Sequence, residues 1–200
     1  ENHRYKLADS GSRAVIHDDI EGLETEIQIG RAEFAAMFDS GNDAPCQVDR
    51  ALDAPLRLGY TGGTTGKAKA VTLTTRGELA ELSAFLIDLV PDLEPGNTFL
   101  HAAPIAHASG AFFLPAIARG VRSLVMKKFD PAEFIELASR EQASHTFLVP
   151  TMLAMILEQP NLADAKFALR KIAYGASPIA PSVLKRAEDR FGRIFAQCYG

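Results

Sequence analysis

The second half of the chain shows a regular alternation of apolar and amphipathic segments. From residue 97 onward, short apolar runs recur about every 25 residues, with helical patterns between them. Strands that alternate with helices at this spacing predict right-handed βαβ units and a parallel sheet. Because the runs are apolar throughout, both faces of that sheet are expected to be covered. The expected strands are 98–101, 121–126, 145–149, 171–174 and 194–197. Helices are expected at 111–118, from Pro131 onward with Asp130 as its N-cap, at 152–157 and at 181–191.

The first half has a less regular pattern. A helix is expected to end at Gly11, followed by a strand at 14–17 and a helix at 31–38. The acidic stretch 18–26 could bind a metal, but we favour a solvated loop. Two short buried strands are expected at 56–60 and 71–74.

A long helix is expected after the second of these strands. Thr75 and Glu78 have the spacing of a capping box, which predicts a helix start, and Pro91 is expected to end the helix. One helical face is expected to be buried; it carries Leu79, Leu82, Phe85, Leu86 and Leu89. The fold class predicted for the chain is therefore α/β, with a largely parallel sheet and helices on both faces.

Composition narrows the class of protein further. The 200 residues suit one domain or part of a larger one, and 47% hydrophobic with 23% charged residues is enough for a core. A net charge of −4 gives no reason to expect nucleic acid as a partner. No apolar run approaches a membrane span and the polar start is no signal peptide, so a cytoplasmic protein with free thiols at Cys46 and Cys198 is expected.

The stretch between the two short strands has the chemistry of a phosphate-binding loop. Glycines allow the backbone to turn its N–H groups inward, threonine hydroxyls add donors, and Lys67 or Lys69 can supply positive charge. A Walker A loop would need glycine at position 61 and Ser or Thr at 68, where Thr61 and Ala68 stand. The dinucleotide pattern G-x-G-x-x-G is also absent from this stretch, and a flexible hairpin without a ligand remains the alternative. The residues that could hold phosphate are Thr61, Gly62, Gly63, Thr64, Thr65 and Gly66, together with Lys67 or Lys69.

Two further segments follow predicted strands at the edge where ligands of parallel sheets bind. The first, 104–110, contains His107, which by itself is more typical of a packed histidine than of a site residue. The second is the small-residue turn Gly175, Ala176, Ser177 and Pro178, where a flat ring could approach the backbone; an ordinary turn is the alternative.

These segments together resemble the adenylate-forming (acyl-activating, AMP-binding) enzymes. Their loop signature is Tyr/Phe-Thr-Ser-Gly-Thr-Thr-Gly-x-Pro-Lys-Gly, from which this chain departs at Gly62, Ala68 and Ala70. The 104–110 segment is similar to the family's Pro-Leu-Phe-His-x-x-Gly stretch, and 175–178 is similar to its Gly-Ala-x-Pro turn. Residues 197–200 match the start of the family's Gln-x-Tyr-Gly-x-Thr-Glu stretch.

The resemblance implies roles for particular residues. His107 and Lys69 would be catalytic, with His107 between the nucleotide and the carboxylate pocket and Lys69 on the phosphates. The turn 175–178 would line the adenine and acyl pockets, while Tyr199 would stack on adenine beside Gly200. Phe112 and Phe113, on the helix after His107, would line the acyl pocket or only pack in the core. No metal ligand is expected within these residues, because the family's magnesium glutamate would follow Gly200.

The implied activity is that of an ATP-dependent acyl- or aryl-CoA ligase, using ATP, Mg2+ and CoA on a carboxylic acid. Residues 1–200 would form part of its N-terminal AMP-binding domain, without the C-terminal domain and its catalytic lysine, so the isolated chain would be inactive. A peptide-synthetase adenylation domain is an alternative, although the segment 102–109 lacks the aspartate that usually holds the amino group there. A folded but inactive nucleotide-binding module is the other alternative.

Overall fold

The fold is described from a computed structural model, which describes residues 2–18, 20–39, 41, 44, 48–61 and 68–199. The chain divides into two compact units, residues 1–78 and 79–200.

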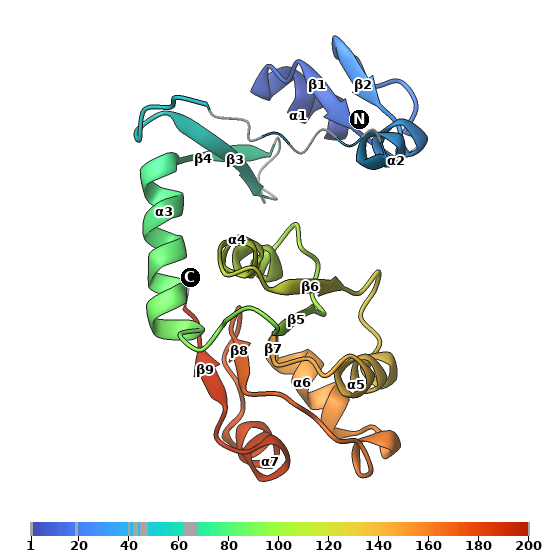
Figure 1. Cartoon of the computed structure of the whole chain (residues 1–200), viewed down its shortest axis with the longest axis vertical. Helices are drawn as coiled ribbons and strands as arrows, with labels where there is room; N and C mark the ends of the chain where they lie inside the picture. The colour runs from blue at the N-terminus through green and yellow to red at the C-terminus, as the bar shows by residue number, and fades with distance from the viewer. Residues whose placement is uncertain are drawn as a thin grey trace. The chain divides into compact units, whose positions relative to one another are not determined.

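The second unit is built on a five-stranded sheet in which all neighbouring strands are parallel (Figure 1). The strand order is β6-β5-β7-β8-β9. The strand bounds are β5 Thr98–His101, β6 Arg122–Val125, β7 His145–Leu148, β8 Lys171–Tyr174 and β9 Phe195–Gln197. The predicted parallel α/β sheet is confirmed, with boundaries that differ from the expected ones by two residues at most.

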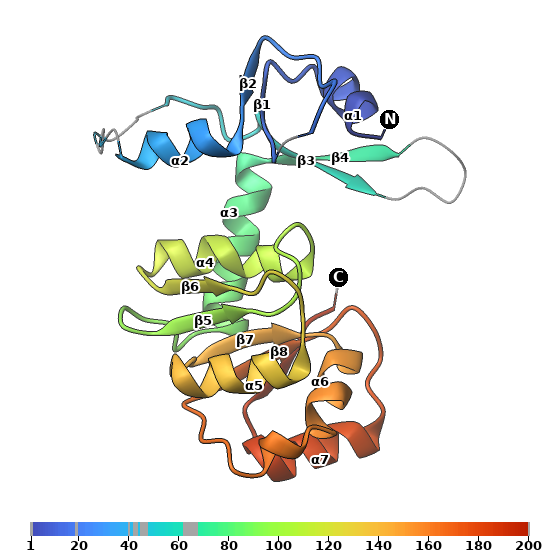
Figure 2. The ribbon, with the colours of Figure 1, turned by 90° about the vertical axis from the view of Figure 1, so that its right-hand side faces the viewer.

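Helices cover both faces of this sheet, as Figures 1 and 2 show. The α-helices of this unit are α4 Phe113–Ala118, α5 Pro131–Arg140, α6 Pro150–Leu157 and α7 Pro181–Phe191. There are also a π-helix, η1 Phe85–Leu89, and two 3-10 helices, η2 Ala108–Phe112 and η3 Pro160–Leu162. One face carries α5, α6 and α7, and the other carries η2 and α4. The predicted cap of α5 is present, because the Glu133 backbone N–H donates to Asp130 Oδ1 at 2.9 Å.

Alternation along each strand explains why the unit has two apolar cores. Successive side chains of a strand point to opposite faces. Leu100, Leu148 and Ile172 therefore pack with α5, α6 and α7 in one core. Their chain neighbours Phe99, Phe147 and Ala173 pack with η2 and α4 in the other.

The connections after β5 and β7 leave the sheet on opposite faces. The chain runs from β5 through η2 and α4 to β6, whereas β7 is followed by α6 on the other face. β5 and β7 are neighbours in the sheet, so their carboxyl ends mark a topological switch point. Ligands of open α/β sheets bind at such a point.

The first unit contains two small sheets. Strand β1 (Ala14–Ile16) pairs in parallel with β2 (Ile27–Ile29), which was not predicted, and β3 (Pro55–Thr61) pairs antiparallel with β4 (Lys69–Thr74). Helix α1 (Asn2–Ser10) ends as predicted before Gly11, whose φ of 62° is a left-handed conformation that suits glycine. Helix α2 spans Arg31–Asp39.

Three expectations for this region are wrong. Strand β3 is not buried in its unit, since Leu56 is 44% exposed. The helix α3 (Thr75–Ala84) is capped by Thr74, whose Oγ1 accepts the Gly77 backbone N–H at 3.2 Å. Glu78 instead accepts a hydrogen bond from Arg57 at 2.6 Å, so the expected capping box does not form. The expected buried helix face is also incomplete, because Leu79 is exposed.

Three further expectations concern the acidic stretch 18–26, the two cysteines and membrane-spanning helices. In the acidic stretch, Asp18 pairs with Arg31 and Glu26 with Arg13, both at the surface. Cys198 is a free cysteine, while Cys46 lies outside the described residues. Within the described ranges, no helix is long and apolar enough to cross a membrane.

Candidate active site

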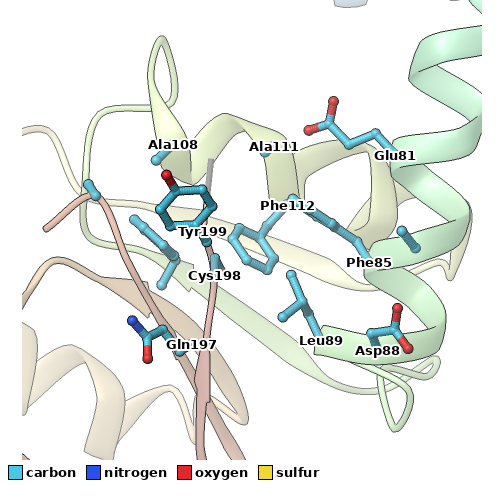
Figure 3. A pocket seen from close by; sticks show the side chains of 13 residues that line it. Glu81, Phe85, Asp88, Leu89, Ala108, Ala111, Phe112, Gln197, Cys198 and Tyr199 are labelled. Carbon is cyan, nitrogen blue, oxygen red and sulfur yellow. The ribbon is translucent and has the colours of Figure 1, made fainter. Parts of the chain in front are cut away.

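A cavity of about 650 Å³ lies within the second unit, at the carboxyl edge of the sheet (Figure 3). Its lining is mainly apolar, with aromatic rings facing small side chains. Two acidic residues, Glu81 and Asp88, are among those that line it. The lining residues are Glu81, Ala84, Phe85, Asp88, Leu89, Ala108, Ala111, Phe112, Phe147, Ala176, Gln197, Cys198 and Tyr199. An apolar cavity with a few polar groups is the usual form of a small-molecule site.

The turn that leads from β5 into η2 depends on a glycine. The His107 backbone N–H donates to Pro104 O at 3.0 Å, and the Gly110 N–H donates to His107 O at 2.8 Å. A Cβ on Gly110 would stand 1.9 Å from Ile105 O, a distance that no side chain could occupy. Only glycine allows the backbone to approach itself so closely here.

The turn after β8 is equally constrained. A Cβ on Gly175 would lie 2.6 Å from Cys198 O, so glycine allows the turn to touch the end of β9. The Cys198 N–H donates to Tyr174 O at 2.7 Å across the same junction. Ala176 has a φ of 69°, which is rare outside glycine and costs about 1–3 kcal/mol. Backbone strain of this kind is concentrated at functional sites.

The two histidines near the end of β5 have different environments. His107 is exposed, is the residue before η2, and is not among the residues that line the cavity. His101 is fully buried, and its Nδ1 lies 3.1 Å from Ser109 Oγ. Burial lowers the pKa of His101, although its hydrogen bond to the Ser109 backbone acts in the opposite direction.

The base of the predicted phosphate loop belongs to the first unit. Thr61, the last residue of β3, is directly opposite Lys69, the first residue of β4. Helix α1 holds this base, because the Tyr5 hydroxyl donates to Ala68 O at 3.0 Å and the Tyr60 hydroxyl donates to Asp9 Oδ2 at 2.7 Å. The hydrogen bond to Asp9 and partial desolvation raise the pKa of Tyr60. The loop residues Gly62, Gly63, Thr64, Thr65 and Gly66 lie outside the described residues, as does Gly200.

The structure brings together some of the predicted site residues. Ala176 and Tyr199 line the main cavity, and with Ser177 and Pro178 they also line an adjoining hollow of about 360 Å³. Gly175 forms the backbone contact behind them. Lys69 and Thr61 belong to the other unit and are described only there.

Sequence reasoning missed several lining residues. Phe147 is on β7, and its alternation with Leu148 predicts that the two side chains point to opposite faces of the sheet. The alternation does not predict that a cavity lies beside Phe147. Glu81, Phe85 and Asp88 share a helical region whose packing partners are distant in sequence. Phe112 lines the cavity and also packs in the core, so both expectations for it apply. Phe113 does not line the cavity and is 36% exposed.

A parallel sheet with a switch point, tight turns and a cavity at its carboxyl edge defines a ligand-binding α/β domain of the kind that holds nucleotides. The family comparison is more specific. The sequence profile described as "AMP-binding enzyme" matches residues 1–200, and the chain belongs to this family. The resemblance to adenylate-forming enzymes is thereby confirmed.

Several curated relatives share this family. The chain is 41% identical over 155 residues to the medium/long-chain-fatty-acid–CoA ligase FadD8 of Mycobacterium tuberculosis, covering 76% of this chain and 27% of that protein. It is 30% identical over 203 residues to a feruloyl-CoA synthase of Amycolatopsis sp., covering 98% of this chain and 40% of that protein. The chain thus spans well under half the length of both relatives.

Solved structures confirm the fold. The N-terminal domain of FACL13 from Mycobacterium tuberculosis matches with a TM-score of 0.84 at 22% identity. The match covers 98% of this chain and 52% of that one. An AMP-binding domain fold is therefore established for this chain.

Proposed function

We propose that this chain is part of an ATP-dependent acid–thiol ligase that activates a carboxylic acid as acyl-AMP and transfers the acyl group to CoA. The observation that carries the proposal is the apolar cavity at the carboxyl edge, between η2 and the turn after β8. The names of the curated relatives, which are fatty-acid and aryl CoA ligases, support the same reaction class.

In the proposed reaction, the substrate carboxylate attacks the α-phosphorus of ATP, the bond to the β-phosphate oxygen breaks, and pyrophosphate leaves. Such chemistry depends on positioning and on neutralising negative charge. Lys69, with the threonine and glycine loop beginning at Thr61, would hold the phosphates. Mg2+ would accompany ATP and neutralise part of the charge on its phosphates.

The cavity suggests how the two substrates share the carboxyl edge. Tyr199 and Ala176 border both the cavity and the adjoining hollow, so adenine against the turn 175–178 would leave the apolar cavity for the acyl group. Phe85, Phe112 and Phe147 supply apolar surface for an alkyl chain or an aromatic ring. His107 would act at the carboxylate end, before the start of η2.

We also propose the domain assignment that follows from this function. Residues 1–200 would form part of the N-terminal AMP-binding domain of the ligase. A C-terminal domain carrying the lysine that the resemblance implies would be supplied by another part of the protein. The isolated chain would then bind nucleotide without completing the reaction.

One observation favours a second candidate, amino-acid adenylation. The 102–109 segment has no acidic residue, but Glu81 and Asp88 line the cavity from α3 and η1. A carboxylate there could hold the ammonium group of an amino acid. The substrate panel of the test must therefore include amino acids.

The test is acid-dependent exchange of labelled pyrophosphate into ATP by the intact protein. The panel is fatty acids of increasing length, hydroxycinnamic and other aryl acids, and amino acids, followed by detection of acyl-CoA after CoA is added. We expect exchange with fatty or aryl acids and CoA-dependent product. Exchange with amino acids alone would establish the second candidate, and no exchange with any acid would overturn both.

A further inference from the structure

His101, the buried histidine at the end of β5, has no role in the proposed binding of ATP or of the acid. His101 is one of two histidines, among five in the chain, that are fully buried in their unit. Its Nδ1 lies 3.2 Å from Ser109 O and 3.1 Å from Ser109 Oγ. Its Nε2 lies 3.3 Å from Ser123 Oγ. The ring thus connects β5 to η2 on one side and to β6 on the other.

The partners determine the proton arrangement of the ring. A carbonyl oxygen only accepts hydrogen bonds, so Nδ1 carries the proton and donates to Ser109. Nε2 is then an acceptor for the Ser123 hydroxyl. A neutral imidazole in this tautomer satisfies both of its nitrogens, which a buried polar group requires.

Aromatic rings hold the imidazole in place. The Phe99 ring lies 4.6 Å from it, centroid to centroid, and the Phe113 ring lies 5.8 Å away. Phe99 is itself fully buried. The imidazole therefore has little freedom to turn away from Ser109.

The segment that His101 contacts carries the cavity wall. Ser109 is the second residue of η2, which also contains Ala108, Ala111 and Phe112, all lining the cavity. The residue before η2, His107, makes no side-chain capping hydrogen bond. Among the described residues, only His101 makes side-chain hydrogen bonds to η2.

We propose that His101 is a positioning residue, which anchors η2 to the sheet and thereby sets the shape of the acid-binding cavity and the position of His107. The proposal rests on the proposed function, because the cavity is taken to bind the acid. His101 touches no substrate and acts through Ser109.

Three substitutions separate the hydrogen bonds of His101 from its bulk. In His101→Asn the side-chain amide stands near the position of Nδ1 and can still donate to Ser109. In His101→Gln the amide stands near the position of Nε2 and can reach Ser123 instead. His101→Phe retains an aromatic ring and loses both bonds.

His145→Asn is the matched control. His145 is equally buried and lies on the neighbouring strand β7, but its nitrogens bond Ser144 and Asp92 at the opposite edge of the sheet. Its substitution should lower stability without affecting η2.

The first measurement is hydrogen exchange of the backbone amides of residues 108–112 in the intact protein. Loss of one ordinary hydrogen bond corresponds to about fivefold faster exchange from a locally opened segment. We expect that acceleration in His101→Gln and His101→Phe, and rates close to the parent protein in His101→Asn and His145→Asn. Equal exchange in the Asn and Gln variants would overturn the anchor.

The second measurement is the KM for acids of increasing size, with the KM for ATP as the internal reference. We expect His101→Gln to raise the KM for the bulkier acids about fivefold more than the KM for short ones, and to leave the KM for ATP unchanged. His101→Asn should show the same KM values as the parent protein. Unchanged acid selectivity despite faster exchange would overturn the positioning role. If the parent protein activates no acid, the proposed function fails, while the exchange rates still decide whether His101 anchors η2.

Discussion

The two edges of the five-stranded sheet use polar groups in contrasting ways. At the amino edge, His145 Nε2 lies 3.2 Å from Asp92 Oδ1 and its Nδ1 lies 2.8 Å from Ser144 Oγ. Ser144 Oγ in turn donates to Thr98 O at 3.1 Å. The Arg170 guanidinium donates a hydrogen bond to Asn97 Oδ1 at the same edge. The polar side chains of this edge satisfy one another.

At the carboxyl edge, the backbone is constrained and the space in front of it is open. Gly110 and Gly175 allow contacts that no side chain would permit, and Ala176 adopts a left-handed φ. The cavity lies at this edge. Backbone strain is concentrated at functional sites, so the carboxyl edge fits the proposed ligand site, whereas the polar side chains of the amino edge bond one another.

The largest effect is expected at the tight turn before η2. Gly110→Ala places a methyl group 1.9 Å from Ile105 O, so the backbone must move. We expect the free energy of unfolding to fall by about 2–4 kcal/mol and adenylation to be lost with it. Denaturant titration and pyrophosphate exchange on the same samples measure both.

Gly120→Ala is the control for this substitution. Gly120 has a φ of 63° but no atom within 4 Å of the added Cβ, so the cost is only that of the left-handed backbone, about 1 kcal/mol. A loss at Gly110 no larger than that at Gly120 would show that the turn is not tightly packed.

The next effect separates function from stability. Lys69→Ala should slow adenylation about tenfold to a hundredfold, because a charge-assisted hydrogen bond to phosphate contributes about 1.5–3 kcal/mol. Lys67→Ala, at the variable position of the signature, should cost much less. Single-turnover formation of acyl-AMP measures the step, and equal impairment of the two variants would contradict the assignment.

A smaller effect is expected from pH at the amino edge. Burial lowers the pKa of His145, and the nearby positive charges of Arg170 and Lys171 lower it further. The hydrogen bond and ion-pair contact with Asp92 raise this pKa, but the net shift is downward. The unfolded chain therefore binds a proton at higher pH than the folded one. Stability should fall as the pH decreases below the unfolded pKa of about 6.5 towards the lower folded value.

His145→Asn tests this pH dependence. The variant should be less stable at pH 8 but show a shallower loss of stability between pH 7 and pH 5, measured by thermal unfolding. The buried His101 also has a lowered pKa, so part of the slope should remain. A slope identical to that of the parent protein would show that His145 does not titrate in this range.

The smallest effect is expected at Phe113. Its side chain is 36% exposed and absent from the cavity lining, in contrast to Phe112, which is 1% exposed and lines the cavity. Phe113→Ala should therefore change acid chain-length preference less than twofold and lower stability by about 1 kcal/mol. A marked change in preference would show that Phe113 shapes the acyl path, either directly or by holding the His101 ring.

The sequence predicted the sheet well for a physical reason. Strands such as 98–101 and 145–148 are covered on both faces, so their apolar runs reflect burial directly. The cap at Asp130 was predictable because its hydrogen bond is local. The exposed strand β3 and the three-residue strand β2 carry weaker patterns.

The site was predicted less completely. Motif resemblance indicated the turn after β8 and Tyr199, of which Ala176 and Tyr199 line the cavity. Phe147, Glu81 and Asp88 could not be found, because their place at the cavity depends on packing between distant segments. The contact between His101 and Ser109 is also tertiary, and nothing in the sequence around His101 distinguished it from an ordinary buried residue.

Filling the cavity at the carboxyl edge tests whether it takes the acyl group. Ala111 lies on η2 and lines the cavity, so Ala111→Phe places a ring in the space proposed for the acyl group. A pocket that loses room for even a methylene discriminates by about tenfold or more. In pyrophosphate exchange by the intact protein, we predict at least a tenfold rise in the KM for long or aryl acids, with the KM for short acids and for ATP unchanged. A uniform change for all acids, or a change confined to ATP, would show that the acyl group does not occupy this cavity.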